Sequence, residues 1–236
     1  MRQVESLTLS GERLLTIYQT MLQAYGPQDW WPADTPFEVM VGAILTQNTA
    51  WTNVEKAIAN LKQADLLYPQ TIADADHELI AEAIRPAGYF NIKTQRLQSF
   101  CNYLQDQGGE VALADRETER LRKDLLAVHG VGPETADDML LYAFDRPVFV
   151  IDAYTRRLLS RIGLIVGDEP YESLRTGIEQ ALGADVPMFN QYHALIVQHA
   201  KVSCRKKPTC ESCCLVSFCQ YQDKGVVGWV RRVARI

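Results

Sequence analysis

The chain has 236 residues, of which 47% are hydrophobic and 22% charged, a composition that excludes a disordered or fibrous protein. Its net charge of −5 argues mildly against a nucleic-acid partner, but the segment from Lys201 onward holds eight basic and two acidic residues and carries about +6, leaving about −11 elsewhere. A polar stretch at 2–11 and the lack of a long apolar run predict a cytoplasmic protein without a signal peptide or membrane span.

Apolar residues recur at helical spacing along most of the chain, which predicts an all-α fold. Ser10 is a candidate N-cap for the first helix, Gly26 ends it, and Pro36 opens the second. In chain order, helices are expected within 10–26, 36–45, 53–62, 76–84, 93–107, 117–128, 135–144, 153–162, 171–182 and 189–201. After residue 202, cysteines replace the periodic pattern.

Five of the six cysteines lie within sixteen residues, which in an intracellular protein indicates a metal site rather than disulfides. Cys204, Cys210, Cys213 and Cys219 have the spacing C-x5-C-x2-C-x5-C, which suits four thiolates around a [4Fe–4S] cluster better than a single zinc ion. Zinc stays an alternative, and Cys214 could replace Cys213 as the third ligand. Cys101 is expected in the core.

A tight turn, Gly130-Val131-Gly132, joins two predicted helices, and Pro133 suits the first turn of the second one. Glycine permits a positive φ and the close approach of another backbone. The amides of such a turn, at a helix N-terminus, can hold a phosphate, although a plain helix–helix turn has the same pattern.

Asp152 follows an apolar run and opens a predicted helix, the usual place of an N-cap. The same carboxylate would suit cleavage of an N-glycosidic bond, because a fixed anion stabilises the cationic sugar of the transition state.

Together with the segments 45–49, 86–93, 151–157 and 199–201, these features resemble the helix–hairpin–helix DNA glycosylases of the endonuclease III superfamily. The resemblance implies a two-lobed fold, with a six-helix barrel domain at 28–146 and a [4Fe–4S] cluster domain formed by 1–27 and 147–236. It also implies a monomer, associated with the nucleoid, that binds double-stranded DNA and flips out a damaged base. Asp152 matches the family's essential carboxylate. The implied DNA contacts are Gln47, which fills the gap in the stack, and Gly130, Val131, Gly132, Thr135, Lys206 and Lys207.

Glu134 stands where bifunctional members of the superfamily carry a lysine nucleophile. A glutamate cannot form a Schiff base, so the resemblance implies base removal without strand cleavage. Trp30, Trp31 and Trp51 resemble the aromatic residues of the 3-methyladenine DNA glycosylase III branch, from which this chain differs in keeping the four cysteines. The tryptophans are equally compatible with core packing.

The leading hypothesis is a monofunctional glycosylase for alkylated purines, with Asp152 stabilising the sugar cation, water as nucleophile, and Trp30, Trp31 and Trp51 around the base. A cationic base leaves without a general acid, and aromatic rings attract it. The alternatives are excision of oxidised pyrimidines or of mismatched uracil or thymine, and a catalytically silent damage sensor.

Overall fold

The structure, a computed structural model, describes residues 7–221. Four of the basic residues of the C-terminal segment lie outside the described part: Lys224, Arg231, Arg232 and Arg235. Residues 7–221 contain helices and no strand, which confirms the all-α prediction. The α-helices are α1 (Gly11–Tyr25), α2 (Pro36–Leu45), α3 (Trp51–Gln63), α4 (Pro69–Asp74), α5 (His77–Ala83), α6 (Phe90–Asp106), α7 (Gly109–Ala114), α8 (Thr118–Leu126), α9 (Pro133–Ala143), α10 (Ala153–Arg161), α11 (Tyr171–Leu182) and α12 (Val186–Val202). Two short 3-10 helices, η1 (Arg85–Ala87) and η2 (Val216–Phe218), complete the set. None of the helices described is long and apolar enough to cross a membrane.

The helix ends follow the local signals in the sequence. Ser10 accepts a hydrogen bond from the Arg13 amide at 3.3 Å, and Gly26 ends α1 with a φ of +71°. Pro36 is the first residue of α2, as expected. The sequence prediction missed α4 and α7, because six residues are too few for a periodic pattern to emerge.

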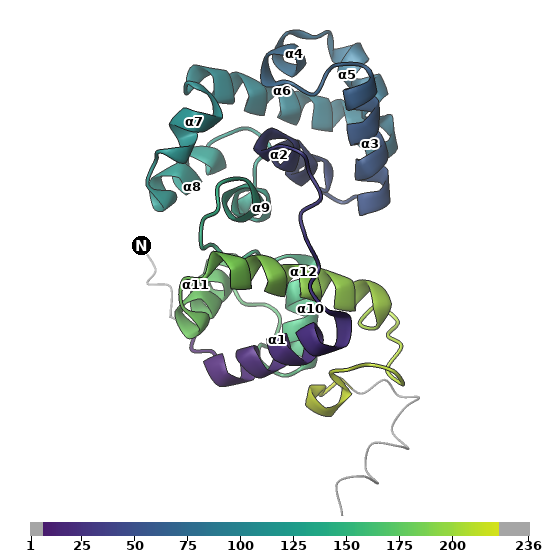
Figure 1. Cartoon of the computed structure of the whole chain (residues 1–236), viewed down its shortest axis with the longest axis vertical. Coiled ribbons are helices and arrows are strands. Elements are labelled where there is room, and N and C mark those ends of the chain that lie inside the picture. The colour runs from purple at the N-terminus through teal and green to yellow at the C-terminus, as the bar shows by residue number, and fades with distance from the viewer. Residues whose placement is uncertain (1–6, 222–236) are drawn as a thin grey trace, which may run out of the picture. The chain divides into compact units, whose positions relative to one another are not determined.

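The chain divides into two compact units. The first contains the described residues up to Gln28, then Ile151–Gly183, and the described residues from Tyr192 on. In it, α1 packs against α11. The second contains Asp29–Val150 and Ala184–Gln191 and includes α2 to α9, drawn from purple to teal in Figure 1.

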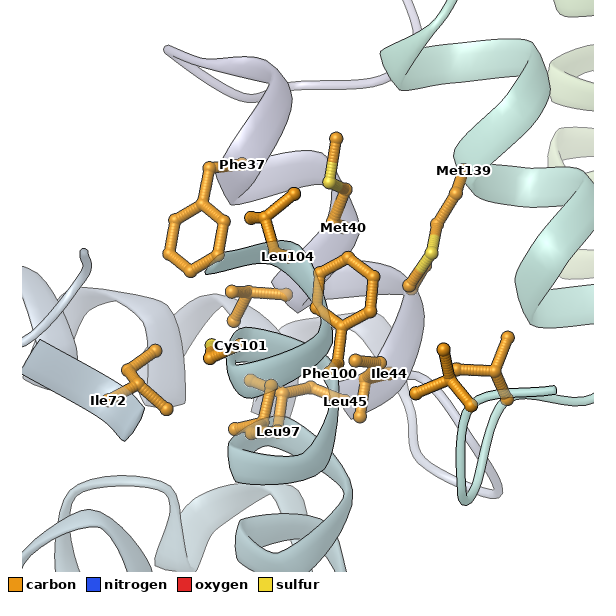
Figure 2. Close-up of a cluster of buried hydrophobic side chains, with 14 of the residues drawn as sticks. Phe37, Met40, Ile44, Leu45, Ile72, Leu97, Phe100, Cys101, Leu104 and Met139 are labelled. Atoms are coloured by element: carbon orange, nitrogen blue, oxygen red, sulfur yellow. The ribbon is translucent and has the colours of Figure 1, made fainter. Parts of the chain in front are cut away.

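Helix α2 lies at the centre of the second unit and contacts α3, α6 and α9. Every residue from Phe37 to Leu45 is buried, so α2 has no solvent-facing side. Figure 2 shows Met40, Ile44 and Leu45 of this helix together with Phe100 of α6 and Met139 of α9. Cys101 is fully buried in the same core, which confirms its expected place.

A buried ion pair joins the two helices of the hairpin, α8 and α9. Arg122 Nε and Nη2 donate to the two carboxylate oxygens of Asp137 at 2.6 and 3.1 Å. The Asp137 side chain is wholly buried and that of Arg122 is 8% exposed. Because both groups are desolvated, their mutual attraction offsets part of the cost of burying each charge.

Replacement of Asp137 by asparagine should lower the free energy of unfolding by about 3–5 kcal/mol, because it removes the buried negative charge that faces Arg122. Urea denaturation measures this difference. Glu82→Gln is the matched control, since it removes a carboxylate from the exposed pair with Arg85 and should change stability little. If Asp137→Asn lowered the free energy of unfolding as little as Glu82→Gln does, the prediction would be wrong, and water would have to reach the Arg122 guanidinium.

Candidate nucleic-acid interface and catalytic site

The two glycines of the hairpin turn have different structural roles. Gly130 has a φ of +86°, and a Cβ there would lie 2.2 Å from Cγ of Arg96, so both the backbone and the packing require glycine. Gly132 has a φ of −95°, which any residue adopts, and a Cβ there would meet nothing within 4 Å. The positive φ that glycine permits is therefore used at Gly130 and not at Gly132, which instead leaves open space before α9.

The N-terminus of α9 follows Gly132 directly. Gly132 is the N-cap residue, so no side chain accepts from the first amides of α9 at this position. Pro133 and Glu134 are exposed in the first turn. Thr135 is buried, and its hydroxyl accepts a hydrogen bond from Gln47. The turn can therefore offer backbone amides to an anion, whereas the Thr135 side chain is engaged inside the unit.

Gln47, in the segment between α2 and α3, is held against the hairpin. Its Nε2 donates to the Gly130 carbonyl at 3.0 Å and to Thr135 Oγ1 at 2.9 Å. Its Oε1 accepts from Nη1 of Arg96. Gln47 and the turn, which the sequence predicts as separate DNA contacts, therefore belong to one hydrogen-bonded network.

The three predicted pocket tryptophans form an aromatic cluster in the second unit. The ring centroids of Trp30, Trp31 and Trp51 lie 4.9 to 5.2 Å apart, and Tyr142 lies 5.2 Å from Trp31. Trp31 and Trp51 pack against the hydrophobic core. A Cβ on Gly42 would lie 3.2 Å from the Trp31 indole, so glycine within α2 makes room for this ring.

Trp30 also lines an open pocket. The pocket is lined by Asp29, Trp30, Asp145, Val186, Pro187, Asn190 and Gln191. None of these lining residues is basic, and the two aspartates are exposed. The pocket therefore combines an indole ring with negative charge, which suits a flat cationic ligand.

Asp152 lies in the first unit, at the start of α10. Its Oδ1 accepts from the Thr155 amide at 2.6 Å, so the N-cap is present as predicted. Its Oδ2 lies 3.6 Å from Nε2 of His193 on α12. Burial alone would raise the pKa of Asp152, but the contact with His193 and the Thr155 amide outweigh it and hold the pKa below its usual range. The carboxylate is thus ionised at neutral pH.

Four of the cysteines line one pocket in the first unit. They are Cys204, Cys210, Cys213 and Cys219, the predicted ligands. Cys214 does not line this pocket. Its Sγ lies 3.7 Å from the hydroxyl of Tyr25 and 3.9 Å from Nδ1 of His199.

Helix α10 reaches the beginning of the cysteine loop. Arg157 Nε donates to the Cys204 carbonyl at 2.8 Å. Arg161 Nη1 donates to Cys204 Sγ at 3.2 Å, and its guanidinium also binds the carbonyls of Arg205 and Lys206. The side chains of Lys206 and Lys207, the predicted phosphate contacts, are exposed.

Sequence reasoning missed three residues of these networks: His193, Arg96 and Lys93. A single histidine or cation on a helix has no motif that marks its partner. Lys93 lay within the segment 86–93 of the resemblance, which was the one available signal, but its buried contacts depend on three separated parts of the chain.

The sequence is similar to those of known DNA repair proteins. Residues 41–183 match the model of the HhH-GPD superfamily of base excision DNA repair proteins. A protein of Methanocaldococcus jannaschii named as a DNA repair glycosylase is 47% identical over 211 residues, which cover 88% of this chain and 96% of that protein. Endonuclease III of Sulfolobus acidocaldarius is 28% identical over 187 residues, 78% of this chain and 82% of that one.

Solved structures show the same fold. The crystal structure of the H. pylori 3-methyladenine DNA glycosylase, bound to 1,N6-ethenoadenine, has a TM-score of 0.71 and 29% identity and covers 82% of this chain and 98% of that one. A non-covalent complex of endonuclease III with DNA has a TM-score of 0.76 at 21% identity and covers 90% and 96% of the two chains.

An all-α fold with a glycine turn leading into an open helix N-terminus is the architecture of a helix–hairpin–helix protein. The chain belongs to the HhH-GPD superfamily of base excision DNA repair proteins, and within it to the DNA glycosylases.

The Asp152 cap gives a test of local structure. Asp152→Ala should lower the free energy of unfolding by about 1 kcal/mol, because the Thr155 amide loses its acceptor. Asp152→Asn should cost clearly less, because the amide oxygen still caps α10. Urea denaturation of both variants at neutral pH measures the two losses. Equal losses would assign the stabilisation to the charge facing His193 instead of the cap.

Proposed function

We propose that this DNA glycosylase removes cationic alkylated purines such as 3-methyladenine and leaves the DNA strand intact. The observation that carries the proposal is the Trp30 pocket, which Trp30, Asp29 and Asp145 line together. A cation over an aromatic ring gains about 0.5–2 kcal/mol, and nearby carboxylates add to that attraction. The similarity to the H. pylori 3-methyladenine glycosylase supports the same class of base.

Asp152 is the proposed catalytic residue. A base that already carries a positive charge leaves without protonation, so the remaining requirement is to stabilise the sugar cation. The low pKa of Asp152 supports this role, because the carboxylate remains negative at neutral pH. Water then adds to the sugar as the nucleophile.

The absence of strand cleavage follows from Glu134. This residue is exposed in the first turn of α9, and its carboxylate cannot form a Schiff base with the sugar. Its negative charge at a helix N-terminus is favourable to the helix macrodipole.

The DNA backbone is proposed to lie on two described surfaces. The first is the N-terminus of α9, where Gly132 leaves the amides of the first turn open to a phosphate. The second is the exposed pair Lys206 and Lys207. Arg161 donates a hydrogen bond to the backbone carbonyl of Lys206. In this proposal Gln47 fills the gap left by the flipped nucleotide.

The residues of the cysteine pocket fit a [4Fe–4S] cluster. Four thiols and the apolar side chains of Leu158, Ile162 and Leu215 line the same pocket. Within residues 7–221, no group of three or more His, Cys, Asp or Glu side chains is arranged to hold a metal ion. Cys204, Cys210, Cys213 and Cys219 would hold the cluster, which supplies a covalent cross-link of the loop and a redox-active centre.

The first experiment measures base release from DNA containing 3-methyladenine, with strand integrity checked before and after alkali. We expect release by the wild type, strands that break only after alkali, and only background release by Asp152→Asn, which keeps the α10 cap. Release of an oxidised pyrimidine, or of mismatched uracil or thymine, in place of the alkylated base would overturn the substrate class. Equal affinity for damaged and undamaged DNA without any release would identify a catalytically silent DNA-binding protein.

Charge selection in the Trp30 pocket has its own test. Asp145→Asn should lower kcat/KM about fivefold for 3-methyladenine, a loss typical of a partly exposed charge contact. The same variant should leave the affinity for DNA containing the neutral base 1,N6-ethenoadenine unchanged, and Asp106→Asn, on the surface of α6, is the matched control. An equal loss of affinity for the neutral base would show that Asp145 supports the pocket's structure rather than recognising charge.

The third ligand of the cluster can be identified by paired substitutions. Cys213→Ser should lose the iron and acid-labile sulfide, of which the wild type is expected to hold about four each, whereas Cys214→Ser should keep both. Metal and sulfide analysis of the purified full-length chain gives the result. The reverse pattern would assign Cys214, and zinc in place of iron and sulfide would support the alternative site.

A further inference from the structure

Helix α6 carries two cationic residues one turn apart, Lys93 and Arg96. Both donate hydrogen bonds to the segment that contains Gln47. Lys93 is 1% exposed, and its ammonium donates to the Leu45 carbonyl at 2.7 Å, to Thr49 Oγ1 at 2.6 Å and to the Ala87 carbonyl at 2.9 Å. Its three N–H groups thus meet three acceptors. Lys93 therefore binds the backbone of Leu45 and the side chain of Thr49, one on each side of Gln47.

Arg96 acts on the side chain of Gln47. A guanidinium has only donors, so the atom of Gln47 that faces Arg96 must be the oxygen Oε1. The NH2 group must then face the two acceptors, the Gly130 carbonyl and the Thr135 hydroxyl. Arg96 and the Gly130 carbonyl therefore both require the amide to point in this direction.

Arg96 is also part of the hairpin contact. Its Cγ and Cδ lie 2.2 and 2.7 Å from where a Cβ of Gly130 would be, so its aliphatic part fills the space that the glycine leaves. One side chain thus packs beneath the turn and holds Gln47. A methionine at this position would keep the apolar contact with Gly130 and lose the hydrogen bond to Gln47.

We propose that Arg96 is a positioning residue that fixes the Gln47 side chain before DNA binds and couples the Gln47 segment to the hairpin turn. A side chain that is already ordered loses less conformational freedom on binding, and affinity for a site that needs Gln47 rises accordingly. The inference rests on the proposed role of Gln47 in the gap opened by base flipping. It is independent of which base is excised.

The test compares the wild type with Arg96→Met, Arg96→Lys, Gln47→Ala and the double variant Gln47→Ala/Arg96→Met. Affinity is measured for a duplex with a tetrahydrofuran abasic analogue and for the undamaged duplex, over a range of salt concentrations. Both Arg96 variants should lower the ratio of the two affinities about tenfold. In the Gln47→Ala background Arg96→Met should add nothing, because a residue that acts through Gln47 has no effect without it.

Two results would overturn the inference. An equal effect of Arg96→Met with and without Gln47 would show that Arg96 acts independently. Full affinity in Arg96→Lys, together with a salt slope about 0.9 lower in Arg96→Met, would show that Arg96 is a phosphate contact that needs only its charge. Urea denaturation of each variant confirms that it is folded.

A DNA-free measurement separates this inference from the proposed function. In the NMR spectrum of the wild type, the side-chain NH2 of Gln47 should exchange slowly with solvent, and Arg96→Met should make it exchange at least tenfold faster. If the wild type binds both duplexes equally while this exchange still responds, the role of Gln47 in lesion binding fails and the positioning by Arg96 holds. Unchanged exchange in Arg96→Met overturns the positioning itself.

Discussion

The second unit depends on how its central helix ends. Helix α2 is buried along Phe37–Leu45, so the last carbonyl groups of the helix cannot turn to water. The Leu45 carbonyl instead accepts from Lys93, a cation that burial and the neighbouring Arg96 charge bring to a pKa of about 8. The same ammonium holds Thr49 and Ala87, so a single buried group fixes the end of α2, the start of the next segment and η1. If the chain were mobile at this point, the Leu45 carbonyl, the Thr49 hydroxyl and the Ala87 carbonyl would lose their hydrogen bonds to Lys93.

The segment fixed in this way continues into the hairpin. Gln47 lies between the two anchored positions, and its amide links Arg96 to the Gly130 carbonyl and the Thr135 hydroxyl. The buried pair of Arg122 with Asp137 holds the two hairpin helices together behind the turn. Gln47 and the hairpin turn, the proposed DNA contacts, are thus built as one hydrogen-bonded network.

In the first unit, one helix connects the candidate catalytic carboxylate with the cysteine loop. Asp152 caps α10 at its start, where the Thr155 amide and His193 keep the carboxylate ionised. Later on the same helix, Arg157 and Arg161 bind the Cys204 carbonyl and thiol. Since a helix is a stiff element, the position of the loop and the position of the carboxylate are mechanically related within this unit.

The sequence alone determined the helical class, most helix positions, the family and the four cysteines of one pocket. These depend on local periodicity, caps and short motifs, which are properties of neighbouring residues. The sequence did not indicate that His193 contacts Asp152 or that Arg96 contacts Gln47. Nor did it indicate the different roles of Gly130 and Gly132, or the contact of Cys214 with Tyr25. These were decided by tertiary structure, because each depends on contacts between segments distant in the chain: Arg96 meets Gln47 across 49 positions and Cys214 meets Tyr25 across 189. Burial makes those contacts obligatory, since a polar group without water must find its partner wherever the fold brings one.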